Sequence, residues 1–258
     1  MGKLPISVFL ITRNEAARLP ATLAALDWAD EIVVVDSGST DATCAIAEAA
    51  GARVSHRDWT GYGPQKVHAE GLCRNEWVLN LDADEVATPA LAAELATLWS
   101  SPPAPATFRL RILNVYPGDR APRWLANDYN VVRLYHRRVA GYRDHAVYDR
   151  VEVAAGTQIR QLRAPVHHVT LTDWHQFVEK ENRHSSFLAA EQPPRRFLRA
   201  RLVWEMPIVF LKFYLLRGHI TGGWKGFFFA LSAAYARTLR LAKMLERQEA
   251  ATRDEECG

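Results

Sequence analysis

Cysteine is scarce in this chain of 258 residues, which contains only Cys44, Cys73 and Cys257. Three widely spaced cysteines exclude a disulfide framework and a cysteine-based zinc site. A reducing, intracellular compartment is therefore the simplest expectation. We also expect no secretory signal peptide, because the sequence runs from Met1 into an apolar strand without a charged region, an apolar region and a cleavage site.

Long apolar runs are missing as well. The most apolar stretches near the C-terminus, 203–216 and 226–236, are shorter than the ~20 residues that a membrane-spanning helix needs. They are rich in aromatic side chains, so we expect amphipathic helices that lie at a membrane interface. The expected anchors are Trp204, Tyr214, Trp224 and the phenylalanines at 227–229. A helical pair packed against the rest of the chain, or against a second copy, is the alternative.

The charges are distributed unevenly, although the net charge is only +3. Segment 193–243 holds ten Lys and Arg and one acid, Glu205, whereas the remainder holds 22 basic and 28 acidic residues. A basic, aromatic segment joined to an acidic body predicts contact with an anionic membrane surface. Neutralisation of the acidic body by this segment is the alternative. Nucleic acid is not an expected partner, because the basic residues are mixed with Phe and Trp.

Three short apolar runs in the first third, 6–11, 32–36 and 77–82, predict buried parallel strands, since they are almost continuously apolar and rich in β-branched residues. Helical patterns lie between them, at 20–26 and after the capping residues 39–41. Alternation of strand and helix predicts an α/β fold with right-handed crossovers. Weaker patterns later in the chain predict strands at 107–115, 130–135 and 150–153 and a helix at 172–190.

Each of the three early strands ends in a polar cluster, at 12–15, 36–41 and 82–85. In open α/β sheets, ligands bind beyond the carboxyl ends of the strands, so the three clusters predict one shared site. No G-x-G-x-x-G follows the first strand, which excludes a dinucleotide-dependent oxidoreductase.

The cluster Asp82-Ala83-Asp84 is the most informative. Two carboxylates at alternate positions repel each other unless a cation lies between them. Oxygen ligands favour Mg²⁺ or Mn²⁺, ions that take the rest of their shell from phosphate and water. A nucleotide-diphosphate leaving group fits such a site. A D-x-D pattern alone is common by chance, but its position after an apolar strand makes it specific.

These segments resemble the nucleotide-sugar-binding half of the inverting family-2 glycosyltransferases with the GT-A fold. The residues that carry the resemblance lie at 11–15, 34–41, 65–66 and 81–85. The later part resembles the WaaE/KdtX-like lipopolysaccharide-core glucosyltransferases, through His168, the Lys180-x-Asn-Arg183 segment and a glycine-rich turn at 218–226. The resemblance covers nearly the whole chain.

The resemblance implies a GT-A fold, in which a Rossmann-like nucleotide-sugar-binding sheet carries an acceptor-side extension, with C-terminal amphipathic helices. It implies a catalytic domain at 1–192, with a nucleotide-sugar half at 1–100 and an acceptor half at 101–192. A membrane-associating helical segment at 193–247 and a polar tail at 248–258 complete the expected organisation.

The resemblance also implies the roles of the donor-site residues. Asp36 accepts a hydrogen bond from the uracil or ribose, Asp82 lies near the ribose and the metal, and Asp84 binds the metal directly. Further nucleotide contacts are expected from Thr12, Asn14, Glu15, Ser37 and Lys66. A solvated position on a helix is the alternative for Lys66.

An inverting transfer needs a general base for the acceptor hydroxyl. Relatives often have Val-His-Glu where this chain has Val147-Tyr148-Asp149, so Asp149 is the expected base, with Asp144 and His145 in reserve. Pairing with the neighbouring Arg150 is the alternative for Asp149.

Three further residues are assigned through the resemblance. His168 completes the metal shell or holds the diphosphate, and a structural role is its alternative. Lys180 and Arg183 lie about one turn apart on a predicted helix, where they suit an anionic acceptor. Solvated helix charges are the alternative for both.

The expected function is therefore transfer of a sugar, glucose by resemblance, from a UDP-sugar to a lipid-linked saccharide such as the lipopolysaccharide inner core. The reaction requires Mg²⁺ or Mn²⁺, and the protein is expected at the cytoplasmic face of the cell membrane. Transfer to another cell-envelope polysaccharide or glycan is the first alternative. A non-catalytic nucleotide-sugar-binding module is the second.

Overall fold

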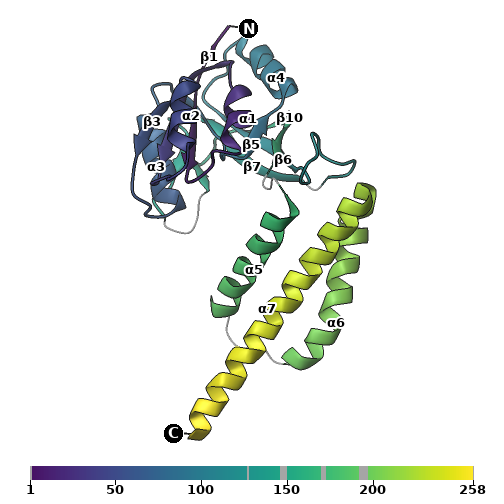
Figure 1. Ribbon diagram of the computed structural model, residues 1–258. Helices are drawn as coiled ribbons and strands as arrows, with labels where there is room; N and C mark the ends of the chain where they lie inside the picture. Colours follow the sequence, from purple (N-terminus) through teal and green to yellow (C-terminus); the bar gives the residue numbers. More distant parts are fainter. Residues whose placement is uncertain (1, 127, 146–149, 170–172, 192–196, 258) are drawn as a thin grey trace. The chain divides into compact units, whose positions relative to one another are not determined.

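The computed structural model divides into two compact units (Figure 1). The sheet unit comprises Met1–Val115 and Asp128–Thr170, and the helical unit comprises Tyr116–Asn127 and Leu171–Gly258. The structure describes residues 2–126, 128–145, 150–169, 173–191 and 197–257. The helix predicted at 172–190 falls in the helical unit, and the predicted domain boundary after residue 192 stays a prediction.

The sheet unit is built on an eight-stranded sheet with the strand order β3-β2-β1-β4-β7-β6-β10-β5. Its strands are β1 (Leu4–Thr12), β2 (Ala29–Asp36), β3 (Arg53–His56), β4 (Trp77–Asn80), β5 (Glu85–Ala87), β6 (Thr107–Asn114), β7 (Asp128–His136) and β10 (Ile159–His168). Strands β1 to β4 are parallel, β7 runs antiparallel to both of its neighbours, and β5 runs antiparallel to β10. A small second sheet pairs β8 (Ala140–Tyr142) with β9 (Val151–Val153).

Four helices connect the strands: α1 (Leu19–Ala24), α2 (Thr43–Ala49), α3 (Tyr62–Leu72) and α4 (Pro89–Trp99). Helices α1 and α4 both begin with a proline in the first turn, where the missing N–H has no intrahelical partner to lose. In α4 the Thr88 hydroxyl also accepts a hydrogen bond from the Leu91 amide, at 3.2 Å.

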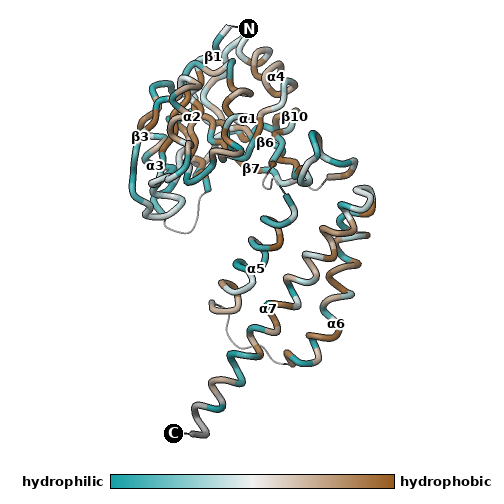
Figure 2. The backbone as a smooth tube through the Cα atoms, in the orientation of Figure 1, coloured by the Kyte–Doolittle hydropathy of each residue, from teal (hydrophilic) through white to brown (hydrophobic). Residues whose placement is uncertain are grey.

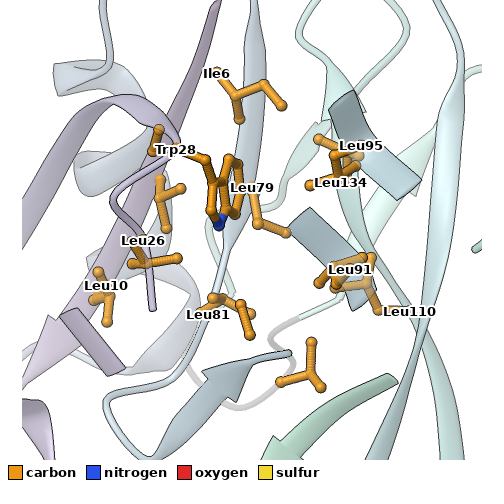
Figure 3. Packing of buried hydrophobic residues seen from close by; sticks show 14 of the residues in the cluster. Ile6, Leu10, Leu26, Trp28, Leu79, Leu81, Leu91, Leu95, Leu110 and Leu134 are labelled. Atoms are coloured by element: carbon orange, nitrogen blue, oxygen red, sulfur yellow. The ribbon is translucent and has the colours of Figure 1, made fainter. Parts of the chain in front are cut away.

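Hydrophobic clusters cover both faces of the sheet. In β1, Ile6, Val8 and Leu10 belong to the larger cluster, and Phe9 between them belongs to the smaller cluster on the opposite face. Side chains alternate between faces along a strand, so a strand buried on both faces is continuously apolar. Figure 3 shows part of the larger cluster, in which Trp28 lies among leucines from strands and helices. The two-sided burial fixes where each parallel strand ends.

The α/β prediction is confirmed. The runs at 6–11, 32–36 and 77–82 form β1, β2 and β4, although β4 ends at Asn80. The strands predicted later in the chain correspond to β6, β7 and β9. Strands β3, β5, β8 and β10 were not predicted. The first three have only three or four residues, and β10 is rich in polar side chains and contains Pro165.

The helical unit consists of α5 (Trp174–Glu191), α6 (Leu198–Leu211), a π-helical turn η1 (Lys212–Leu216), a 3-10 turn η2 (His219–Gly222) and α7 (Gly223–Cys257). Helix α7 packs against both α5 and α6 (Figure 1). It also continues through the predicted polar tail to Cys257. None of the described helices combines the length and hydropathy required to cross a membrane.

The glycine-rich turn before α7 is a close-packed joint. A Cβ at Gly222 would lie 2.6 Å from the Tyr116 ring, and one at Gly226 would overlap the His219 carbonyl group. The His219 ring stacks on Phe229 with centroids 4.5 Å apart, and its Nδ1 lies 2.5 Å from the Tyr116 hydroxyl. Glycine is therefore required at 222 and 226 because no side chain fits.

Candidate active site

Asp36 ends β2 directly beside Thr12, which ends β1. Its carboxylate accepts hydrogen bonds from the Thr12 hydroxyl at 3.1 Å and from the Gly38 and Ser39 amides at 2.9 and 2.7 Å. Burial alone would raise the pKa of Asp36, but the bonds from Ser39, Thr12 and Gly38 lower it below its ordinary value. Asp36 is therefore a preorganised, ionised acceptor at the edge of the sheet.

Asn14 and Glu15 join the loop after β1 to the loop after β2. Asn14 has a left-handed backbone with φ of 56°, its amide donates to the Ser39 hydroxyl at 2.8 Å, and its side-chain oxygen accepts from the Thr40 amide at 2.8 Å. The Glu15 amide donates to the Thr43 hydroxyl at 2.8 Å. These contacts fix the shape of both loops.

Lys66 lies on α3 and is only 1% exposed. Its ammonium group donates to Asp82 Oδ1 at 3.2 Å and lies 5.4 Å from the centre of the Tyr142 ring. A buried ammonium group needs such a partner, because its desolvation is otherwise very unfavourable. The solvated alternative for Lys66 is therefore wrong.

Arg133 on β7 binds the second oxygen of the Asp82 carboxylate. Its guanidinium group donates to Asp82 Oδ2 at 3.0 Å and to Glu85 Oε1 at 3.4 Å, and it also bonds Asn80. Burial alone would raise the pKa of Asp82, but Arg133 and Lys66 lower it well below the ordinary value. Glu85 is fully buried, and burial raises its pKa although Arg133 opposes this effect.

Asp84, just before β5, faces His168, which is the last residue of β10. His168 Nε2 lies 3.3 Å from Asp84 Oδ2, and Arg18 Nη1 lies 3.8 Å from the same oxygen. The pairing of β10 with β5 places His168 opposite Glu85, while the His168 Nδ1 lies 2.9 Å from Asn114 Oδ1. Burial alone would raise the pKa of Asp84 and lower that of His168, but their mutual hydrogen bond reverses both shifts.

Asp84 and His168 fit a divalent cation as two adjacent ligands. Ligands of Mg²⁺ or Mn²⁺ lie about 2.0–2.2 Å from the ion, so neighbouring ligand atoms are about 3 Å apart. Both oxygens of Asp82 are already engaged by Lys66 and Arg133. The described residues contain no group of three or more His, Cys, Asp or Glu suited to a metal. An ion held by Asp84 and His168 would have its remaining positions open to substrate and water.

Residues 7–157 match the family model described as Glycosyl transferase family 2. The chain belongs to this family. It is similar to an uncharacterised glycosyltransferase of Rickettsia felis, at 35% identity over 93% of this chain and 89% of the relative. It is also similar to LpsC of Rhizobium meliloti, a lipopolysaccharide core biosynthesis glycosyltransferase, at 30% identity over 95% and 93% of the two chains.

Two solved structures are similar to this family-2 glycosyltransferase. Staphylococcus aureus TarS 1–349 aligns over 97% of this chain and 92% of its own, with 16% identity and a TM-score of 0.48. Glucosyl-3-phosphoglycerate synthase of Mycobacterium tuberculosis, in complex with Mn²⁺, UDP-glucose and glycerol 3-phosphate, aligns over 44% and 45%, with 25% identity and a TM-score of 0.34. The family and the mixed sheet together establish the GT-A fold of the glycosyltransferase.

The structure brings most of the predicted donor-site residues of the glycosyltransferase to one edge of the sheet unit. Ser37 joins them, because its hydroxyl accepts a hydrogen bond from Gln65 at 2.7 Å. Lys180 and Arg183 instead lie on α5 in the helical unit, where Arg183 is exposed. The predicted base Asp149 lies outside the described residues. The roles of Asp149, Lys180 and Arg183 stay predictions.

The reserve residues Asp144 and His145 lie on a segment packed against the start of α3. A Cβ at Gly63 would overlap the His145 carbonyl oxygen and lie 2.7 Å from that of Arg143, so only glycine fits there. No described contact links Asp144 to the carboxylate cluster formed by Asp82, Asp84 and Glu85.

Sequence reasoning missed Arg133, Asn80, Tyr129 and Tyr142. Tyr142 donates to Asn80 Oδ1 at 2.7 Å, and Tyr129 donates to Glu85 Oε1 at 3.4 Å. One signal was present for Arg133, which interrupts the apolar run of a predicted strand. A buried arginine requires carboxylate partners, and the acids at 82–85 were the obvious candidates.

Proposed function

We propose that this family-2 glycosyltransferase is a metal-dependent inverting hexosyltransferase. In this proposal it moves a sugar from a nucleotide-diphosphate sugar, with UDP-glucose favoured, to a lipid-linked saccharide such as the lipopolysaccharide inner core. The observation that carries the proposal is the 3.3 Å pair of Asp84 and His168 beside Asp82, which Lys66 and Arg133 hold ionised. The similarity to LpsC supports the choice of acceptor.

The donor binds across the ends of β1, β2 and β4. Asp36 accepts hydrogen bonds from the uracil or ribose, because its oxygens are held in place by neighbouring hydroxyl and amide groups. The loops fixed by Asn14 and Glu15 shape the same pocket. Asp84 and His168 would hold the Mg²⁺ or Mn²⁺ ion, which when bound stabilises the charge of the departing diphosphate.

Asp149 is the proposed base. It takes the proton from the acceptor hydroxyl as the oxygen attacks the anomeric carbon on the face opposite the diphosphate, so the anomeric configuration inverts. Lys66 and Arg133 do not transfer protons in this scheme. Their role is to keep Asp82 a carboxylate and to fix its two oxygens.

We propose that the enzyme acts at the cytoplasmic face of the cell membrane. Along α6 and η1, the side chains of Trp204, Ile208, Leu211 and Leu215 are each at least half exposed. Their spacing puts them on one helical face. Figure 2 shows hydrophobic residues along α6. Exposed apolar patches of this kind mark binding surfaces, and basic residues of the same segment suit anionic lipid.

The expected membrane anchors on α7 differ in their exposure. Trp224 is 66% exposed and Phe227 is 47% exposed, as an interfacial anchor requires. Phe229 instead stacks on Phe177 of α5, with ring centroids 5.2 Å apart. A Trp204→Ser/Ile208→Ser variant should therefore bind anionic liposomes less than the wild type. A Phe229 variant should lose stability instead.

The first experiment is a nucleotide-release assay with the purified full chain. UDP-, GDP- and ADP-sugars are each offered with Mn²⁺, with Mg²⁺ or with a chelator. Metal-dependent release of one nucleotide, with loss in Asp84→Asn, supports the proposal. Release that is unchanged by chelation, or a protein that neither binds nor hydrolyses any of these donors, contradicts it.

Another cell-envelope polysaccharide or glycan is the second candidate acceptor, because the donor site would be the same. Acceptor fractions distinguish the two. Sugar transfer into a lipid-extractable product favours the lipid-linked acceptor, and transfer into a water-soluble glycan favours the alternative.

A further inference from the structure

A cavity of about 590 Å³ opens beside the carboxylate cluster in the sheet unit. Its walls come from β6, β7 and the two strands of the small sheet. The polar side chains that line it include Arg109, Tyr129, Arg133, Tyr142 and Arg150. This volume is in the usual range for a small-molecule site.

The cavity shares side chains with the candidate active site. Arg133 donates to Asp82 at 3.0 Å, and Tyr129 donates to Glu85 at 3.4 Å. The Lys66 ammonium group lies over the Tyr142 ring, 5.4 Å from the ring centre. A molecule in this cavity therefore lies next to the residues around Asp82 and Glu85.

The cavity is cationic. Three arginines line it, and none of the described residues of its lining is acidic. Arg133 is already shared between two carboxylates. Arg109 and Arg150 are exposed, and within the described part of the chain neither guanidinium group has a hydrogen-bond or ion-pair partner. Two such groups suit a carboxylate or a phosphate, which a guanidinium group binds with two parallel hydrogen bonds.

The cavity also has features that suit a sugar ring. Tyr129 is 37% exposed, so its ring offers a flat apolar face together with a hydroxyl group. The remaining wall includes Val131, Val132 and Val151, which present apolar surface. A ring with one anionic substituent matches this combination better than a free inorganic anion does.

We propose that this cavity is the acceptor subsite and that it takes a saccharide carrying a carboxylate or a phosphate. Arg109 and Arg150 bind the anionic group, and Tyr129 contacts the ring. Arg150 directly follows Asp149, the proposed base, in the sequence. The inference rests on the proposed function, since it assigns the acceptor side of the same site.

The donor diphosphate is the other possible source of negative charge here, because His168 lies on β10, directly beside β6. Asp36 lies on β2, and Arg109 lies on β6, four strands away in the order β2-β1-β4-β7-β6. Neighbouring strands are about 4.8 Å apart, so the two strands are separated by about 19 Å across the sheet. Asp82, which follows the end of β4, lies between them. The cavity is thus away from Asp36, which is proposed to hold the nucleoside, and UDP binding to the cavity variants distinguishes the diphosphate from an acceptor.

The test uses three probes and the purified full chain. Glucose 6-phosphate, glucuronate and neutral methyl glucoside are titrated, and binding is measured by ligand-observed NMR. The two anionic sugars should bind about tenfold more tightly than methyl glucoside, because each gains charge-assisted hydrogen bonds. Arg109→Gln and Arg150→Gln should each remove most of this preference.

Arg138→Gln is the matched control. Arg138 is an exposed arginine of the same unit, paired with Glu76 at 3.4 Å, and it does not line the cavity. It should leave the preference unchanged. Equal affinity for charged and neutral sugars, binding of none of them, or the same loss in Arg138→Gln would overturn the proposal.

UDP binding separates this inference from the proposed function. Arg109→Gln and Arg150→Gln should bind UDP with Mn²⁺ as the wild type does. If they lose UDP affinity, the cavity holds donor phosphate and the acceptor assignment is wrong. If the wild type itself binds no nucleotide sugar, the proposed function fails, whatever the sugar probes show.

Discussion

Replacing Arg133 should destabilise the sheet unit more than replacing an exposed arginine does. Arg133 is 7% exposed and connects Asp82 with the fully buried Glu85. Removing one partner of a buried ion pair costs about 3–5 kcal/mol, because the other charge is left in a poorly solvated place. Asp82 keeps its bond to Lys66, so Arg133→Met should lose about 3 kcal/mol, at the lower end of that range.

The loss is measured by thermal unfolding, with circular dichroism as the signal and hydrogen exchange of β1 and β4 amides to identify the sheet unit. For a domain of this size, about 3 kcal/mol corresponds to a fall in Tm of about 6–12 °C. The exposed, paired Arg138→Met should lose at most about 1 kcal/mol.

A second substitution tests the electrostatic cause. Glu85→Gln removes the charge that Arg133 leaves behind, while the amide oxygen can still accept from the Asp82 amide. The double variant Arg133→Met/Glu85→Gln should therefore be more stable than Arg133→Met alone, by about 1 kcal/mol or more. A single variant within about 0.5 kcal/mol of the wild type, or a double variant no better than the single one, would refute this reasoning.

Three further outcomes are expected. Asp84→Ala should abolish sugar transfer with an unchanged circular dichroism spectrum, and retained transfer would end the metal assignment. Asp149→Asn should lose turnover while donor affinity, measured by calorimetry, is kept; normal turnover would move the base elsewhere. Burial, with Arg123 and Arg217 nearby, lowers the pKa of His219 from 6.5 to about 4. Because only the unfolded imidazole is protonated between these values, stability should fall by about 3 kcal/mol as the pH falls from 6.5 to 4. His219→Gln should lack this part of the pH dependence, and an unchanged slope in that variant would assign it to other groups.

The positions of the residues proposed to bind the donor were largely predictable from the sequence. Strands β1, β2 and β4 are continuously apolar, so their ends could be located, and parallel strands bring such ends to one edge. Thr12, Asp36 and Asp82 follow from that rule alone. The apolar pattern of each strand is a local feature, but it is sufficient to locate these residues because each polar cluster directly follows its own strand.

The groups that complete the site were less accessible to sequence reasoning. Arg133 and His168 reach the cluster from β7 and β10, whose register is set by pairing with distant strands. Lys66 lies on α3 in a mixed polar sequence, and its burial depends on the partner Asp82. Local periodicity contains no information on such partners. The length of α7 was also underestimated, although its Glu, Arg and Ala residues favour helix.

The pairing of β5 with β10 has a consequence for how the chain acquires its function. Asp84 is synthesised early, and His168 follows only after β6 to β9 have been made. Bringing the two together closes a long loop, and the entropy lost is recovered only when the sheet is complete. A nascent or partly folded chain therefore has the carboxylate without the imidazole. The 3.3 Å pair of Asp84 and His168 therefore forms late in folding, and an ion that needs both groups would bind only after the sheet is complete.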